Sequence, residues 1–364
     1  MSGTIVLSAG GTGGHLFPAQ ALANELVKRG RKIVVMTDAR FANYATQFPG
    51  ADIATVPSSP FNAITAPFKI AAGIVVALAK LMKLKPAAVI GFGGYPSVPV
   101  MLAATSLRLP TAIIEQNAVV GRANRLVMDR VKTVAAAFPI ARFAPRDKSK
   151  IVLTGNPLRP EVEALWGASY NVPVASGPIR LLVFGGSQGA RALSEVVPAA
   201  LTRLPQDMKM RLTVVQQCRP EDMEQVRQVY ANAEIRCQLE SFFSDLPQRM
   251  AESHLVIARS GAGTVAELMA IGRPAILVPL PGALDDNQTP NADILDRAGA
   301  GWKIRQSDLT PDSLAQMIIQ IFADPLALAR RATAAHALAT PNAAARLADV
   351  VDDLVNPSSK KEAA

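Results

Sequence analysis

The 364-residue chain contains few of the residues that build disulfide frameworks or structural metal sites. Its two cysteines, Cys218 and Cys237, form no Cys-x-x-Cys pair and lie in no histidine-rich segment. This usage argues against a disulfide framework and a structural zinc site, and it is typical of a reducing compartment. The chain also lacks an uncharged apolar run of the roughly 20 residues that span a bilayer. Its first residues have neither the basic region nor the cleavage site of a signal peptide, so we expect a cytoplasmic protein.

Acidic residues are scarce in the first half of the chain. Residues 1–159 contain 19 Lys and Arg against 6 Asp and Glu, a net charge of +13, whereas residues 160–364 contain 19 against 23, a net charge of −4. This asymmetry favours an anionic partner, although a solubilising surface stays an alternative. Phosphate groups and an anionic membrane both fit the charge. Nucleic acid is not expected, because no aromatic-basic interleaving or recognised binding motif accompanies the charge.

Short apolar runs alternate with segments of helical period, which predicts parallel sheets with helical crossovers. The expected strands span residues 4–9, 32–37, 87–92, 111–115, 133–136, 180–184, 211–215, 255–259 and 275–279. The length exceeds one typical domain. We therefore predict two Rossmann-like α/β domains facing a cleft: residues 1–160, with a last helix at 341–355 packing back on them, and residues 161–340. The Pro-, Gly- and Ser-containing stretch 167–178 is typical of a linker.

Three glycine-rich turns follow expected strands, at residues 10–15 (GGTGGH), 91–97 (GFGGYPS) and 185–189 (GGSQG). Glycine lets the backbone approach a phosphate closely, and the following helix N-terminus offers free N–H groups. One such turn is weak evidence, since tight turns need glycine for steric reasons, but three predict a phosphorylated ligand. None matches the P-loop, so phosphoryl transfer from ATP is not expected, and none has the spacing and acidic residue of a dinucleotide fingerprint.

A fourth turn, residues 259–264 (RSGAGT), precedes a helix that we expect to begin at Val265. Thr264 and Glu267 have the spacing of a capping box, which would need no ligand. Alternatively, Glu267 accepts hydrogen bonds from ribose hydroxyls while the turn holds a diphosphate. The spacing alone leaves both interpretations open.

Six motifs in order carry a resemblance to a known family. They are GGTGGHLFPA (10–19), GGYPS (93–97), EQNAVVGRANR (115–125), TGNPLR (154–159), GGSQGA (185–190) and RSGAGTVAEL (259–268). Together they resemble the MurG family, N-acetylglucosaminyltransferases that complete lipid II in bacterial peptidoglycan synthesis, and the resemblance covers almost the whole chain. It implies the GT-B fold and inverting transfer of GlcNAc from UDP-GlcNAc to the C4 hydroxyl of the MurNAc of lipid I. It also implies no metal or other cofactor and a peripheral location at the cytoplasmic face of the inner membrane, with roles in cell shape and division.

The resemblance also implies a donor site, held mainly by the C-terminal domain. The implied donor-binding positions are Thr12, Gly13, Gly14, Asn117, Arg159, Ser187, Phe243, Ala262, Gly263, Thr264, Val265, Ala266, Glu267 and Gln288. Ser187 and the turn ending at Thr264 would hold the diphosphate, and Glu267 the ribose. The backbone at Phe243 would line the uracil pocket, and Gln288 would contact sugar hydroxyls. The first glycine loop would meet the donor across the cleft.

One of the three histidines, His15, is the expected catalytic base. Direct displacement needs a group that takes the proton of the acceptor hydroxyl, and histidine titrates in a suitable range. A purely structural role in the glycine loop stays open. The sequence departs from the family at Ile114, where histidine is common, and at residues 285–287 (Asp-Asp-Asn), where glutamine, arginine or histidine is common near Gln288. Both departures bear on donor selectivity.

The stretch 68–85 has the pattern of an amphipathic helix. Lys69, Lys80 and Lys83 fall within a narrow arc. The opposite side carries Ile70, Ile74, Val75, Leu78, Leu81 and Met82. A core-packing helix and a monotopic contact with anionic lipid both fit.

Two alternative functions stay open beside transfer to lipid I. A GT-B transferase could use another lipid acceptor, such as diacylglycerol. A non-catalytic nucleotide-sugar-binding subunit is disfavoured because both half-sites lie in one chain.

Overall fold

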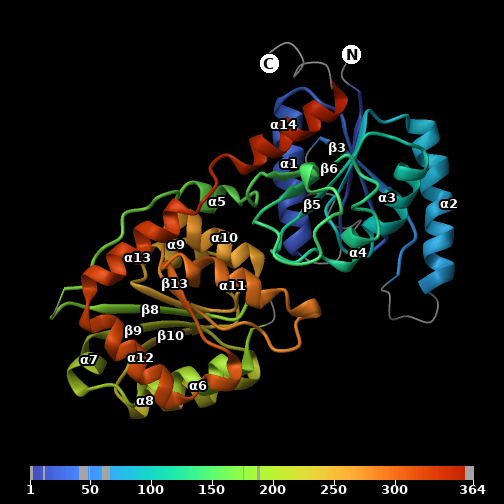
Figure 1. The fold of residues 1–364 in the computed structure, drawn as a ribbon. Coiled ribbons are helices and arrows are strands. Elements are labelled where there is room, and N and C mark those ends of the chain that lie inside the picture. Colours follow the sequence, from blue (N-terminus) through green and yellow to red (C-terminus); the bar gives the residue numbers. More distant parts are fainter. Residues whose placement is uncertain are drawn as a thin grey trace. The chain divides into compact units, whose positions relative to one another are not determined.

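The protein is described by a computed structural model that covers residues 3–10, 13–40, 48, 50–59, 66–174, 176–186 and 189–356 (Figure 1). The chain divides into two compact units. Unit 1 comprises Met1–Arg159 and Thr340–Ala364, and unit 2 comprises Pro160–Ala339. Each unit is built on one parallel sheet with helices on both faces, so the predicted α/β class is confirmed.

The described part of unit 1 contains a seven-stranded sheet in the order β3-β2-β1-β4-β5-β6-β7, with all neighbours parallel. The strands are β1 (Ile5–Ser8), β2 (Ile33–Thr37), β3 (Ala51–Thr55), β4 (Ala88–Gly91), β5 (Thr111–Glu115), β6 (Thr133–Ala136) and β7 (Ile151–Leu153). The helices are α1 (Gly13–Lys28), α2 (Ala66–Leu84), α3 (Ser97–Ser106), α4 (Arg122–Arg125) and α14 (Ala343–Val355). Successive side chains of a strand point to opposite faces of the sheet, so Ile5 and Leu7 pack with α1 and α14, and Val6 packs with α2 and α3.

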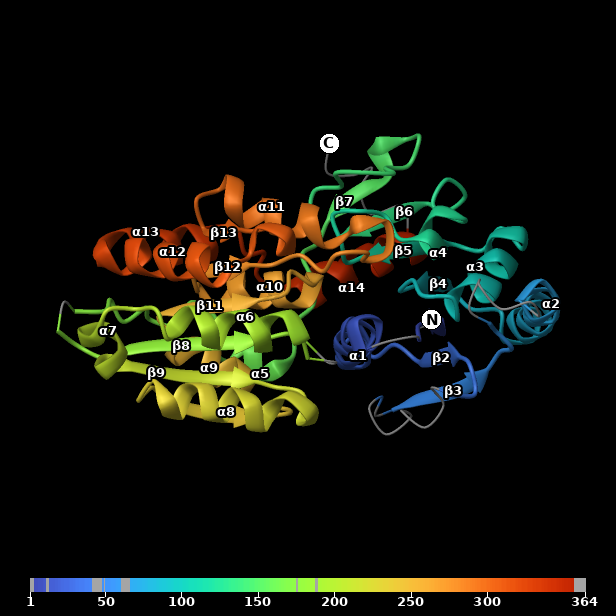
Figure 2. The ribbon, with the colours of Figure 1, turned by 90° about the horizontal axis from the view of Figure 1, so that it is seen from below.

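The described part of unit 2 contains a six-stranded sheet in the order β10-β9-β8-β11-β12-β13. The strands are β8 (Ile179–Phe184), β9 (Leu212–Gln217), β10 (Arg236–Glu240), β11 (Leu255–Ala258), β12 (Ala275–Leu277) and β13 (Gly301–Lys303). The helices are α5 (Pro160–Glu163), α6 (Arg191–Leu201), α7 (Gln206–Arg211), α8 (Met223–Asn232), α9 (Leu246–Glu252), α10 (Ala262–Ile271), α11 (Gln288–Arg297), α12 (Pro311–Ala323) and α13 (Pro325–Ala337). Figures 1 and 2 show α6, α8 and α12 on one face of this sheet and α9, α10 and α11 on the other.

The C-terminal helix α14 is an integral part of unit 1. Its Leu347 and Val351 are fully buried in the core that also contains α1. At its surface, the Arg29 guanidinium donates to Asp349 at 2.7 Å and to Asp352 at 2.9 Å, and Arg31 donates to Asp352 at 2.6 Å. The last helix therefore supports α1, the helix whose first turn carries His15.

The stretch 167–178, which we predicted to be a linker, instead lies inside unit 2. The N–H of Gly167 donates to the carbonyl of Ala270 at 2.9 Å, and the Tyr170 hydroxyl donates to the carbonyl of His254 at 2.9 Å. The chain passes between the units at residues 159–160 and 339–340. The Pro and Gly content of this stretch thus reflects an irregular but anchored surface segment.

Candidate active site

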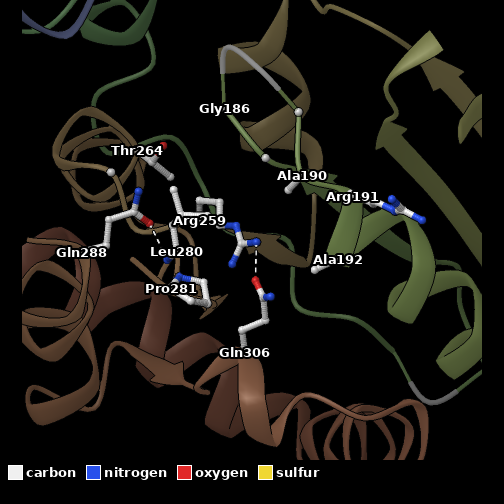
Figure 3. Close-up of a pocket in the computed structure, with 13 residues that line it drawn as sticks. Gly186, Ala190, Arg191, Ala192, Arg259, Thr264, Leu280, Pro281, Gln288 and Gln306 are labelled. Atoms are coloured by element: carbon white, nitrogen blue, oxygen red, sulfur yellow. Dashed lines mark hydrogen bonds between the residues drawn. The ribbon is translucent and has the colours of Figure 1, made fainter. Parts of the chain in front are cut away.

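The unit 2 sheet carries a pocket of about 520 Å³ where β8 and β11 end (Figure 3). These strands are neighbours although they are far apart in sequence, so the pocket lies at the point where the strand order reverses. Open α/β sheets bind ligands at this point. The pocket is lined by Gly185, Gly186, Gly189, Ala190, Arg191, Ala192, Arg259, Gly261, Thr264, Leu280, Pro281, Gln288 and Gln306.

Two helices, α6 and α10, begin at this pocket. Their N-cap residues, Ala190 and Gly261, make no side-chain capping hydrogen bond, so no cap side chain covers the first N–H groups of either helix. Both helix dipoles place positive potential at these ends. Two converging N-termini are suited to a ligand with two anionic groups, such as a diphosphate.

The loop between β8 and α6 requires glycine. A Cβ at Gly185 would collide with the backbone of Ala190, and Gly186 and Gly189 have φ values of +88° and +68°. Glycine adopts this left-handed region without the steric cost that other residues meet. Gly185, Gly186 and Gly189 therefore bring backbone to the pocket wall without side chains of their own. Ser187, the expected diphosphate contact on this loop, lies outside the described residues.

Gln217, at the end of β9, connects this glycine loop to the segment after β10. Its Oε1 accepts from the N–H of Gly185 at 3.1 Å, and its Nε2 donates to the carbonyls of Gly186 at 3.0 Å and Ser241 at 3.2 Å. Ser241 precedes Phe243, where we expect uracil to lie. One buried amide thus sets the spacing between the expected diphosphate and base positions, a role that the sequence analysis missed.

Arg259 provides a buried positive charge in the pocket. It is only 7% exposed, and its guanidinium donates to the carbonyls of Val278 at 3.1 Å and Pro279 at 3.2 Å and to Oε1 of Gln306 at 2.6 Å. Burial lowers the pKa of Arg259. Because these three acceptors are neutral, the charge is left for an anion in the pocket. Figure 3 shows the Arg259–Gln306 pair on the pocket wall.

Gln288, the first residue of α11, forms another side of the pocket. Its Oε1 accepts from the N–H of Leu280 at 2.9 Å (Figure 3). Its backbone carbonyl accepts from the Ser260 hydroxyl at 2.8 Å. These bonds tie the start of α11 to the turn that precedes α10. The first of these bonds also orients the side-chain amide of Gln288.

In unit 1, His15 lies in the first turn of α1 and packs against the second glycine turn. A Cβ on Gly93 would lie 3.5 Å from His15 Cε1, and one on Gly94 would lie 3.2 Å from His15 Cδ2. Burial is the largest influence on the pKa of His15 and lowers it from 6.5, against the opposing effects of the Phe92 backbone and the Gln116 side chain. The imidazole is therefore neutral at neutral pH, the form that accepts a proton.

The segment after β5 is held by a buried carboxylate, Glu115, which the sequence analysis did not single out. Its oxygens accept from the N–H of Asn117 at 3.0 Å, the N–H of Gly121 at 2.8 Å and Nδ2 of Asn124 at 2.9 Å. Burial raises the pKa of Glu115, and these hydrogen bonds oppose the rise. Glu115 thereby shapes the loop that contains Gln116 and Asn117.

Comparison with known proteins adds independent findings. Residues 5–136 match the N-terminal domain and residues 180–351 the C-terminal domain of glycosyltransferase family 28. A protein of Rhodopseudomonas palustris is 50% identical over 354 residues, covering 95% of this chain and 97% of the relative. It is named UDP-N-acetylglucosamine--N-acetylmuramyl-(pentapeptide) pyrophosphoryl-undecaprenol N-acetylglucosamine transferase. A relative of the same name from Phenylobacterium zucineum is 48% identical over 359 residues, covering 97% of this chain and 98% of the relative.

The crystal structure of MurG from Acinetobacter baumannii superposes with a TM-score of 0.81 at 33% identity, covering 96% of this chain and 99% of that chain. The chain belongs to the MurG family. The calicheamicin glycosyltransferase CalG4, at 16% identity and a TM-score of 0.66 over 98% of this chain and 99% of its own, shares the fold. The predicted GT-B fold of two Rossmann-like domains is thus confirmed.

Six of the expected donor residues, Ala262 to Glu267, form the first part of α10. Helix α10 begins at Ala262, three residues earlier than we expected, so Thr264 is a first-turn residue and caps nothing. The capping-box interpretation of Thr264 and Glu267 is therefore wrong. Val265 and Ala266 are buried, and the N–H of Val265 donates to the Gly261 carbonyl at 3.0 Å, whereas Gly263 lies in the first turn and has no side chain. Glu267 is half-buried one turn further along α10.

The two phenylalanines after Ser241 lie differently. Phe243 is 7% exposed, with the Arg249 guanidinium 4.5 Å above its ring, whereas Phe242 is 71% exposed. The Phe243 ring is therefore buried, and the MurG-type uracil contact through its backbone stays a prediction.

The remaining MurG-type positions lie in unit 1. Gly13 and Gly14 begin α1, and Thr12 lies outside the described residues. Asn117 is half-buried in the Glu115-supported loop. The Arg159 guanidinium lies 5.6 Å from the centre of the Phe17 ring.

The residues that depart from the family pattern have structural roles where they lie. Ile114 is 1% exposed in the sheet core, so it changes packing rather than a ligand contact. Asp286 accepts from the Thr289 hydroxyl at 2.6 Å at the start of α11.

The other two histidines have structural partners within unit 2. His254 accepts from the N–H of Arg180 at 3.0 Å, and Nδ1 of His336 lies 3.1 Å from the Ala270 carbonyl. Of the three histidines, His15 is the one beside glycine turns at the carboxyl edge of a sheet.

Proposed function

We propose that this protein transfers GlcNAc from UDP-GlcNAc to the C4 hydroxyl of the MurNAc of lipid I, giving lipid II with inversion at the transferred carbon. The observation that carries the proposal is the unit 2 pocket, where two uncapped helix N-termini and the buried Arg259 guanidinium meet. Such a pocket fits the diphosphate of a sugar nucleotide. The relatives named for this reaction are 50% and 48% identical in sequence to this chain, which supports the same substrates for both.

The diphosphate is also the leaving group, so the same pocket assists the chemistry. As the bond from the sugar C1 to the diphosphate oxygen breaks, negative charge develops on UDP. Preorganised N–H dipoles and a guanidinium stabilise charge that develops in a transition state. Gln288 would hold sugar hydroxyls, Glu267 the ribose and the Phe243 backbone the uracil, which keeps the anomeric carbon oriented for attack.

His15 would act as the base on the acceptor side. The acceptor O4 attacks C1 of GlcNAc, its proton passes to the neutral imidazole, and UDP leaves with the bonding electron pair. This single displacement inverts C1 and needs no further reactant. The lowered pKa of His15 keeps the base unprotonated at neutral pH.

The first test is UDP release by the purified protein, given UDP-GlcNAc with and without a short-chain lipid I analogue. We expect release that depends on this acceptor. Release with a diacylglycerol instead would support a transferase function with a different lipid acceptor. Tight UDP-GlcNAc binding without turnover on either acceptor would instead favour the non-catalytic subunit.

We also propose that unit 1 binds an anionic membrane surface through α2. No helix in the described part of the chain combines the length and hydropathy needed to cross a bilayer. The inner side of α2 packs in the core through Ala77 and Leu81, whereas Phe68, Val75 and Met82 are 80%, 66% and 55% exposed. Their seven-residue spacing places them along one side of the helix. The core-packing interpretation therefore holds for the inner side of α2, and the membrane contact is proposed for its exposed side.

Basic residues accompany this exposed apolar strip of Phe68, Val75 and Met82. Lys69 and Lys83 are also exposed on α2. Apolar side chains that enter the headgroup layer and lysines that attract anionic lipid together produce peripheral binding. We therefore propose a peripheral location at the cytoplasmic face of the membrane that carries lipid I.

Replacing the strip with serine (F68S/V75S/M82S) is expected to reduce binding to anionic vesicles at least tenfold, because three apolar side chains no longer leave water. Wild-type binding should also weaken steeply as salt rises, since the lysine contribution is screened. Vesicle co-sedimentation measures both. Leu326→Ser, at a residue 66% exposed in unit 2, is the matched control. Equal binding by the triple variant and the control would contradict the proposal.

A further inference from the structure

A second charged cluster lies at the carboxyl end of β2, outside the residues used so far. Asp38 follows β2 and is 4% exposed. Its Oδ1 accepts from the N–H of Arg40 at 3.0 Å, and its Oδ2 accepts from the Arg40 guanidinium at 2.8 Å and the Ser58 hydroxyl at 3.0 Å. A buried carboxylate with three donors is an anchor rather than a ligand group, so it serves to hold Arg40.

Arg40 is held from a second side by an aromatic ring. Its guanidinium carbon lies 5.1 Å from the centre of the Tyr95 ring, and Tyr95 belongs to the turn after β4. The Arg40 side chain is nevertheless 57% exposed. Arginine carries five N–H donors in a planar fork, and Asp38 engages one end of it. The exposed remainder of the fork is therefore pre-oriented and open to solvent.

This cluster adjoins the loop that supports His15. The strand order β2-β1-β4 places the ends of these three strands side by side. Tyr95 directly follows Gly94, and a Cβ on Gly94 would lie 3.2 Å from His15 Cδ2. Thr37, the residue before Asp38, has a buried hydroxyl with no hydrogen-bond partner among the described residues. The Arg40 fork, the unpaired Thr37 hydroxyl and the expected base thus share one edge of the unit 1 sheet.

A local turn would explain only part of this arrangement. The N–H of Arg40 bound to Asp38 closes a short turn, as aspartate commonly does. It does not require the guanidinium to lie on a ring from another loop, nor a third loop to supply Ser58. A planar fork with free donors beside a reaction site is the usual way to bind carboxylate or phosphate.

We propose that Arg40, fixed by Asp38 and Tyr95, binds an oxyanion of the lipid-linked acceptor, either a pyrophosphoryl oxygen or a peptide carboxylate. This inference rests on the proposed function, because it concerns the acceptor of that reaction. It assigns to the acceptor a binding group separate from the donor pocket of unit 2. Arg40 is therefore a binding residue that positions the acceptor relative to His15.

The test compares wild type, Arg40→Met, Arg40→Lys and Tyr95→Leu in steady-state UDP release, with direct titration of UDP-GlcNAc as a separate readout. We expect Arg40→Met to lower kcat/KM for the acceptor about ten- to hundredfold, the range for loss of a charged hydrogen bond, with donor binding unchanged. Arg40→Lys should recover part of the loss and Tyr95→Leu should lose less. Arg146→Met, at a side chain that is 93% exposed, is the control.

Two acceptors distinguish the two oxyanions. If Arg40 binds a peptide carboxylate, the loss should disappear with an acceptor analogue that lacks the peptide, and if it binds pyrophosphate, the loss should persist. Equal kcat/KM for wild type and Arg40→Met on both acceptors would overturn the inference. A fall in donor affinity alone would also overturn it. Absence of turnover in the wild type would count against the proposed function instead, so the two failures are distinguishable.

Discussion

His15→Ala is expected to lower kcat by about 10²- to 10⁴-fold, the range for loss of a positioned general base. Donor affinity should stay within about twofold, because most of the expected donor contacts, the diphosphate pocket among them, belong to unit 2. The prediction follows from the surroundings of His15, where burial lowers the pKa of the imidazole and keeps it neutral. Steady-state UDP release with a short-chain acceptor measures kcat, and titration with UDP-GlcNAc measures donor binding.

His15→Gln separates a base from a structural hydrogen-bonding group. Glutamine keeps a polar side chain at the start of α1 but cannot accept the proton, so it should be as inactive as alanine if His15 is the base. The pH profile gives a second check. Because the pKa of His15 lies below 6.5 in the folded protein, wild-type kcat/KM should be constant near neutral pH and fall only when acid protonates the imidazole. Near-wild-type kcat in His15→Gln would remove His15 from the chemistry.

The strands that sequence analysis predicted are the central ones. β1, β4 and β5 of unit 1 are buried at every position, and their sequences (IVLS, AVIG and TAIIE) are mostly apolar. The four strands that were missed, β3, β7, β10 and β13, are the edges of the two sheets. Edge strands pair on one side and are partly exposed, so β10 reads Arg-Cys-Gln-Leu-Glu and carries no apolar run. Their pairing depends on a neighbour that the local sequence does not specify.

The site residues also differ in how much of their role the local sequence indicates. Glycine turns are local signals, and they indicated the carboxyl ends of the strands in both sheets and the start of α10. The residues that hold these turns in place act over long separations. Gln217 reaches Ser241, 24 residues away, and Arg259 reaches Gln306, 47 residues away. A glutamine or arginine inside a strand or turn has no local pattern that announces such a partner, so these roles became visible only in the fold.

Arg273 is the clearest example, and its replacement should have the largest effect on stability. The side chain is 1% exposed and lies just after α10. Its guanidinium donates to the carbonyls of Ala251, Ala168, Ile271, Gly272 and Ser169. Two of these carbonyls belong to the end of α10, where the helix leaves acceptors unpaired and its dipole favours a cation. Burial lowers the pKa of Arg273 to about 10, so the charge persists at neutral pH.

Arg273→Met keeps much of the volume and removes every donor, which leaves buried carbonyls without partners. We expect unit 2 to lose about 3–5 kcal/mol of unfolding free energy, more than a typical single substitution costs. Both tryptophans of the chain, Trp166 and Trp302, belong to unit 2. Urea unfolding followed by tryptophan fluorescence therefore reports on this unit alone, which matters because a two-unit chain need not unfold in one step.

Arg203→Met is the matched control for this loss. Arg203 also belongs to unit 2, but it is 44% exposed and pairs with the exposed Asp312. Exposed ion pairs contribute about 0–1 kcal/mol, so this variant should unfold close to wild type. Arg273→Lys should fall between the two, because it keeps the charge but reaches fewer carbonyls than the planar fork. Because α10 begins at the proposed donor pocket and its last carbonyls are held by Arg273, the Met variant should also bind UDP-GlcNAc more weakly below its unfolding transition. If Arg273→Met and Arg203→Met unfold at the same urea concentration, the buried carbonyls have found other partners and Arg273 does not hold the end of α10.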